Sequence, residues 1–231
     1  MPDWSAPQRP IDHAEESLVT AILDGDFTPG QALPGERDLA SQLGVTRPTL
    51  REALRRLERD GWLTIQQGKH TRVNDFWREG GPNILAAMAR YSDHLPPEFV
   101  TKLLEVRSVL APAYIGAAVA RRATEAEALV VQHEQLDDTA EAFARFDWHL
   151  HHGLSELSGN PVYTLILNGF SGFYEEVATV YFKPPEARQV SRDFYQLLQV
   201  AAREKNVILA EQASKDVMRK SIELWRATSD E

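Results

Sequence analysis

The chain has 231 residues, a net charge of −9 and no cysteine, and 43% of its residues are hydrophobic. These values are typical of a folded globular protein with room for two domains, and they exclude disulfides, thiolate metal sites and a cysteine nucleophile. No apolar run approaches the roughly 18 residues that cross a bilayer, and the N-terminus lacks the apolar stretch of a signal peptide. We therefore expect a cytoplasmic protein that does not engage a membrane.

Three helices and a hairpin are predicted in the first third of the chain. Apolar spacing indicates a helix over residues 12–24 and a short one over 36–43. Thr46 can cap a third amphipathic helix that runs to Arg59. Two short β-prone runs around a glycine-containing turn predict a hairpin within residues 62–73. This order of elements is that of a winged helix-turn-helix.

The predicted third helix carries side chains suited to DNA. Although the whole chain is acidic, residues 30–75 hold eight basic and six acidic side chains, which leaves −11 on the remainder. Arg47, Arg51 and Arg55 are four residues apart and share a face away from the leucine stripe. A guanidinium in the major groove can bind guanine O6 and N7 or hold a phosphate. We therefore predict that this helix enters DNA.

The second half of the chain is predicted to be entirely helical. Helices are expected over residues 98–122, 124–157, 161–181, 185–204 and 206–227. The fold class is therefore mainly α with a small β-wing. We predict a winged helix-turn-helix domain over residues 1–75, a linker over 76–96 and an all-helical effector-binding and dimer-supporting domain over 97–231.

Asp147 and His151 raise the possibility of a metal site. They lie at positions i and i+4, which places a carboxylate and an imidazole on one helix face. No histidine follows His152, so two of the four ligands of such a site are missing and we predict no metal. The alternative, a repressor that responds to a metal-bound organic acid, stays open. No phosphate loop or nucleophile motif is present, so we do not expect an enzyme.

Several motifs resemble those of a known family. The segments Leu33-Pro34-Gly35-Glu36-Arg37, Gly44-Val45-Thr46-Arg47 and Thr49-Leu50-Arg51-Glu52-Ala53-Leu54 resemble the DNA-binding domain of the GntR superfamily. The segments Ser158-Gly159-Asn160-Pro161 and Leu165-Ile166-Leu167-Asn168-Gly169 resemble its FadR branch, which regulates fatty-acid metabolism. The resemblance implies a homodimer on a palindromic operator that represses fatty-acid degradation genes, activates unsaturated fatty-acid synthesis genes and is released by long-chain acyl-CoA.

The resemblance also implies two sets of site residues. The DNA-binding set is Arg37, Thr46, Arg47, Thr49, Arg51, Gln67, Gly68 and Lys69. The effector-binding set is Arg107, His151, Tyr174, Tyr181, Ser221 and Trp225. The chain departs from the FadR pattern at Pro48, Gln67, His151, Val217 and Met218, where that branch has threonine, histidine, phenylalanine, tyrosine and glycine. We expect these departures to change operator preference and accommodated acyl length rather than the mode of action.

Overall fold

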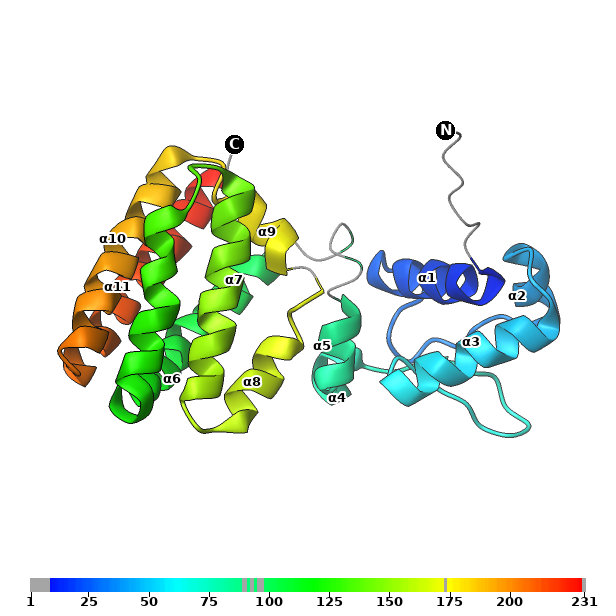
Figure 1. Cartoon of the computed structure of the whole chain (residues 1–231). Coiled ribbons are helices and arrows are strands. Elements are labelled where there is room, and N and C mark those ends of the chain that lie inside the picture. Colours follow the sequence, from blue (N-terminus) through cyan, green and yellow to red (C-terminus); the bar gives the residue numbers. More distant parts are fainter. Residues whose placement is uncertain (1–8, 89–90, 92–93, 95–97, 173, 230–231) are drawn as a thin grey trace, which may run out of the picture. The chain divides into compact units, whose positions relative to one another are not determined.

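The computed structural model describes residues 9–88, 91, 94, 98–172 and 174–229 (Figure 1). The chain divides into two compact units, Met1–Leu95 and Pro96–Glu231. The predicted boundary between residues 96 and 97 lies outside the described residues.

Unit 1 contains the predicted winged helix-turn-helix. Its elements are α1 (Pro10–Leu23), α2 (Glu36–Gln42), α3 (Arg47–Asp60), β1 (Leu63–Thr64), β2 (Arg72–Val73), α4 (Phe76–Glu79) and α5 (Pro82–Met88). The strands pair antiparallel, with Leu63 opposite Val73. Helix α3 packs against α1, α2 and α5, and its leucine stripe is buried. At its end Gly61 adopts a φ of 100°, a conformation that suits glycine and closes the helix.

The predicted linker is partly helical and belongs to unit 1. Helices α4 and α5 occupy most of residues 76–88. Phe76, Ile84 and Met88 are buried, and the Phe76 ring lies 5.0 Å from that of Trp62. These apolar side chains account for the helices, because the segment buries a face against the wing and α3.

Unit 2 is all helical. Its elements are α6 (Phe99–Val130), the 3₁₀ helix η2 (Val131–Gln135), α7 (Ala140–Leu157), α8 (Pro161–Asn168), α9 (Tyr174–Tyr181), α10 (Pro185–Arg203) and α11 (Val207–Ser229). Helix α6 packs against α7, α10 and α11, and α7 also packs against α8 and α9 (Figure 1). Tyr114, Phe143, Leu150 and Tyr195 lie in this core with at most 1% of their surface exposed.

Three predicted helices of unit 2 have wrong boundaries. The helix expected over residues 98–122 does not end there, because α6 continues to Val130 with a kink at Arg122 (φ −143°, ψ 50°) near the predicted break. The helix expected over residues 124–157 is broken, because α6 continues to Val130 and the chain becomes extended at Leu136. Thr139 then caps α7, accepting a hydrogen bond from the Ala142 amide at 3.2 Å. The helix expected over residues 161–181 ends at Asn168, after which the Ser171 hydroxyl donates to the Asn168 carbonyl at 2.9 Å. At the last two of these breaks a hydroxyl side chain satisfies backbone groups outside the helical ladder.

One described helix is long and apolar enough to cross a membrane. Residues Phe99–Gln135 include a window with a mean hydropathy of 1.4, contrary to the expectation that no such run exists. Length and composition alone do not distinguish a spanning helix from the central helix of a bundle. Here α6 buries Ala111, Tyr114, Ile115 and Ala118 against the neighbouring helices, as the central helix of a bundle does, while Val109 on the same helix is exposed.

Candidate functional site

The N-terminus of α3 presents two threonines at the surface. The Thr46 hydroxyl accepts a hydrogen bond from the Thr49 amide at 3.3 Å, and the two hydroxyl oxygens lie 2.8 Å apart. The Thr46 side chain is exposed and that of Thr49 is half-buried. Free amide groups and the helix dipole at such an end favour an anion, so the geometry suits a DNA phosphate.

Three arginines of the predicted DNA-binding set lie beside carboxylates. The Arg51 Nε atom is 2.7 Å from Glu36 Oε2, and the Arg47 Nη2 atom is 3.9 Å from the same oxygen. Arg37 Nε lies 3.1 Å from Asp38 Oδ1, and the Arg37 side chain is 85% exposed. The structure therefore joins Arg47 and Arg51 through Glu36, a residue that the sequence did not single out.

The predicted wing tip forms the turn between the two strands. Gly68 has a φ of 76°, and the Lys69 amide donates to the Gln66 carbonyl at 3.0 Å. Gln67, Gly68 and Lys69 are exposed. Glycine at a positive φ lets this turn form and leaves no side chain at its tip. All eight residues of the predicted DNA-binding set thus lie on the surface of unit 1, and their contact with DNA stays a prediction.

An apolar cavity of about 110 Å³ lies within unit 2. Helices α6, α7, α8, α9, α10 and α11 contribute to its wall, which includes Leu103, Leu110, Ile166, Phe170, Val177, Phe194 and Met218. All six predicted effector-binding residues also line it, namely Arg107, His151, Tyr174, Tyr181, Ser221 and Trp225. The structure brings together these six residues from four helices, α6, α7, α9 and α11, and their binding of an effector stays a prediction.

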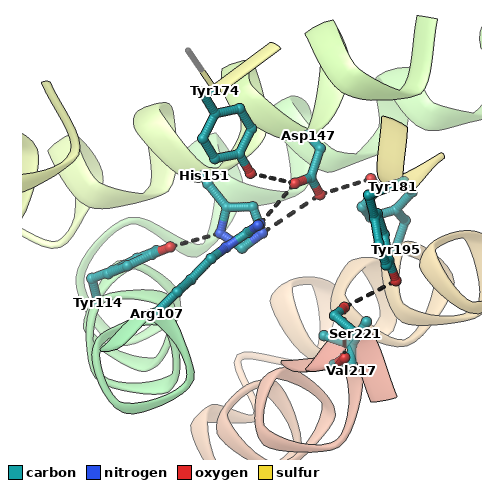
Figure 2. Close-up of polar contacts among 9 residues, drawn as sticks. All are labelled: Arg107, Tyr114, Asp147, His151, Tyr174, Tyr181, Tyr195, Val217 and Ser221. Carbon is teal, nitrogen blue, oxygen red and sulfur yellow. Dashed lines mark hydrogen bonds and ion pairs between the residues drawn. The ribbon is translucent and has the colours of Figure 1, made fainter. Parts of the chain in front are cut away.

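A buried polar cluster surrounds Asp147 at the wall of the cavity (Figure 2). The Arg107 Nη2 atom lies 2.7 Å from Asp147 Oδ2, which also accepts a hydrogen bond from the Tyr174 hydroxyl. The Tyr195 hydroxyl donates to Asp147 Oδ1 at 2.9 Å. Burial would raise the pKa of this carboxyl, but the Arg107 guanidinium and the hydrogen bonds lower it to about 2. Asp147 is therefore ionised at neutral pH.

His151 is part of the same cluster and is uncharged. Only 1% of its surface is exposed. Its Nδ1 atom lies 2.7 Å from the Tyr114 hydroxyl, and its Nε2 atom lies 3.6 Å from Asp147 Oδ1. Burial, reinforced by the nearby Arg107 charge, lowers the pKa of His151 to about 3. Burial also raises the pKa of Tyr114, so its hydroxyl keeps its proton at neutral pH and can donate it in a hydrogen bond to His151 Nδ1.

The cation beside Asp147 is a guanidinium. Arg107 contacts the carboxylate that a metal would need and also lies over the Tyr174 ring at 5.3 Å. Within the described parts of the chain, no group of three or more histidine or acidic side chains could hold a metal ion. Asp147 and His151 do share a helix face as predicted. In the structure Asp147 forms an ion pair with Arg107, and His151 contacts the Tyr114 hydroxyl.

A second polar link joins α9 to α11. The Tyr181 hydroxyl donates to Ser221 Oγ at 3.1 Å, and the Ser221 hydroxyl donates to the Val217 carbonyl at 2.9 Å (Figure 2). Burial raises the pKa of Tyr181, so its hydroxyl keeps its proton at neutral pH. Both residues line the cavity together with Trp225. The link holds two cavity walls together through neutral groups.

The lowered pKa of His151 leads us to expect that the stability of the folded chain depends on pH. Its pKa in the folded chain, about 3, lies below its ordinary value of 6.5. Between these values the unfolded chain binds a proton that the folded chain does not, so stability falls as the pH falls. Between pH 7 and pH 5 we expect the wild type to lose about 2 kcal/mol more free energy of unfolding than His151→Gln. The stabilising effect of Asp147 is lost only below its ordinary pKa of 3.8, outside this window.

Urea unfolding of both proteins at the two pH values measures this difference. The glutamine variant keeps a hydrogen-bonding side chain but has no titratable group, so the remaining histidines cancel in the comparison. Equal losses for both proteins would contradict a buried, neutral His151.

Family models match nearly the whole chain. Residues 10–73 match the gntR family of bacterial regulatory proteins, and residues 74–231 match the FadR C-terminal domain. The chain is 47% identical over 199 residues to a fatty acid metabolism regulator protein of Shewanella sp. (strain MR-4), which covers 86% of this chain and 83% of that protein. It is 42% identical over 218 residues to the protein of the same name from Erwinia tasmaniensis, covering 94% and 92%.

A solved structure shows the same fold. The structure of Lar, described as controlling expression of the Listeria monocytogenes agr system, superposes with a TM-score of 0.65. It is 17% identical and covers 96% of this chain and 99% of that one. The family matches and the identity to named relatives lead to one conclusion: the chain belongs to the GntR family of bacterial transcription regulators and, with its FadR C-terminal domain, to the fatty acid metabolism regulators within it.

Proposed function

We propose that the chain binds a palindromic operator as a homodimer and that a long-chain acyl-CoA in the unit 2 cavity weakens this binding. The apolar cavity lined by the predicted effector residues is the observation that carries the proposal. The regulator then represses fatty-acid degradation genes and activates unsaturated fatty-acid synthesis genes while it is on DNA. Its release follows when acyl-CoA accumulates.

The surface of unit 1 supports the DNA-binding part of this proposal. Two arginines four residues apart on α3 are exposed, and the helix begins with two hydroxyl side chains. A palindromic operator requires two such helices, one from each protomer, in successive major grooves. The exposed glycine turn of the wing leaves room for close approach to a neighbouring groove.

The chemistry of the cavity wall favours a hydrocarbon tail. Leucine, isoleucine, valine, alanine, phenylalanine, tryptophan and methionine side chains form most of the wall, and each buried methylene contributes about 0.8 kcal/mol. The Arg107 charge is already balanced by Asp147, so we assign the acyl tail, not the phosphates, to this interior. A tail that prefers one arrangement of α9 and α11 would shift the population of DNA-bound dimers.

A direct test measures operator affinity with and without acyl-CoA. A duplex selected from random sequences by the purified protein is labelled and titrated in the presence of oleoyl-CoA. We expect the dissociation constant to rise roughly 5-fold to 150-fold, the usual range of coupling between two sites. Unacylated CoA is the control and should leave the affinity unchanged. Operator binding that is insensitive to oleoyl-CoA would refute the effector part of the proposal.

A further inference from the structure

One carboxylate lies between the two arginines of α3 that are predicted to bind DNA. Glu36 Oε2 lies 2.7 Å from Arg51 Nε and 3.9 Å from Arg47 Nη2. The Glu36 side chain is 37% exposed, and those of Arg47 and Arg51 are 56% and 55% exposed. The two cations therefore share one anion at the surface of unit 1.

The position of Glu36 is fixed by the fold. It is the first residue of α2, where the helix dipole favours a carboxylate. Helix α2 packs against α3, which carries both arginines on successive turns. The backbone of Glu36 is thus placed beside the α3 surface by a separate element, and its carboxylate contacts the α3 arginines from there.

A carboxylate in this place affects two kinds of DNA contact differently. Affinity for any duplex comes from the release of counterions when cations neutralise phosphates, and a cation already paired with Glu36 contributes less to it. Reading a guanine instead requires a guanidinium held in one orientation, since two hydrogen bonds must form at once. Glu36 opposes the first contact and favours the second.

We propose that Glu36 is a specificity-determining residue, which positions Arg47 and Arg51 for base edges and disfavours their binding to phosphates of unrelated DNA. The inference rests on the proposed role of these arginines in DNA binding. Glu36 itself need not touch the operator.

The test compares binding to the selected operator and to a scrambled duplex of equal length and composition over a series of salt concentrations. Replacing Glu36 with glutamine removes the charge and keeps the size. We expect Glu36→Gln to bind the scrambled duplex roughly 3-fold to 10-fold more tightly, with a salt slope steeper by about one. Its ratio of operator to scrambled affinity should fall by at least the same factor.

Two further variants separate a local effect from a general change of charge. Asp26→Asn removes one negative charge from an exposed turn of the same unit and should leave the ratio at the wild-type value. Glu36→Asp keeps the charge and should keep weak binding to the scrambled duplex. Thermal unfolding of each variant confirms that the domain is folded, because an unfolded variant loses both kinds of binding.

Two results would overturn the inference. An unchanged affinity ratio in Glu36→Gln shows that the carboxylate has no part in specificity, and an equal change in Asp26→Asn shows that its position is irrelevant. The proposed function fails in a different way. In that case the wild type does not distinguish the operator from the scrambled duplex, and both proposals fall together.

Discussion

Alanine at both Arg47 and Arg51 is expected to weaken operator binding by at least about 30-fold, because each guanidinium that reads a base contributes about 1–3 kcal/mol. Both side chains are exposed and sit on successive turns of α3. Their loss removes the predicted base contacts while the buried leucine stripe of the helix stays intact. Fluorescence anisotropy with the labelled operator, at one fixed salt concentration, measures the change.

Arg59→Ala is the matched control for this experiment. Arg59 lies on the same helix, is 72% exposed and pairs with Asp60 at the far end of α3. Its replacement removes one positive charge, half of the charge removed in the double variant, away from the predicted DNA surface and should change affinity by less than about 3-fold. Should the double variant retain wild-type affinity, α3 is not the recognition helix of this protein.

Replacing Asp147 with alanine is expected to lower the free energy of unfolding by about 3–5 kcal/mol, the usual cost of leaving a buried charge without its partner. The Asp147 side chain is 8% exposed and the Arg107 side chain 22% exposed, and their closest atoms are 2.7 Å apart. The substitution also removes the acceptor for the Tyr174 and Tyr195 hydroxyls. Urea unfolding at neutral pH measures the loss.

A double variant distinguishes the effect of the unpaired Arg107 charge from a simple loss of packing. Asp147→Leu combined with Arg107→Met removes both charges and keeps apolar volume in the wall of the cavity. We expect it to recover at least half of the stability lost in Asp147→Ala, since a buried ion pair contributes little over well-packed apolar groups. If the double variant is as unstable as the single one, the unbalanced charge of Arg107 is not the source of the destabilisation.

Local signals in the sequence predicted the architecture of unit 1 closely. The Thr46 cap, the leucine stripe and Gly61 define α3 within one residue of its predicted start and end. Such features depend on hydrogen bonds and contacts between near neighbours, so the chain itself records them. Two boundary errors in unit 2 arose where Thr139 and Ser171 satisfy backbone groups, because apolar periodicity continues through these short breaks.

The contacts around Asp147 and the pairing of Glu36 with Arg51 could not be predicted from the sequence alone. Tyr195 and Tyr114 were recognisable only as aromatic residues on helices, and spacing does not reveal that they meet Asp147 and His151. Asp147 is 40 residues from Arg107 and 48 from Tyr195, so their contact depends on how three helices, α6, α7 and α10, pack. The pairing of Glu36 with Arg51 spans 15 residues and depends on the packing of α2 on α3.

The concentration of buried hydrogen bonds on Asp147 has a practical consequence for genetics. Because one carboxylate holds side chains from α6, α9 and α10, most substitutions in this cluster damage the whole bundle. Under the proposed function, a selection for bacteria that no longer respond to fatty acids will therefore recover unstable proteins from these positions. Under the same proposal, substitutions at Tyr181 or Ser221, whose link is uncharged, are the place to seek mutants that stay folded and abundant in the cell yet no longer respond to acyl-CoA.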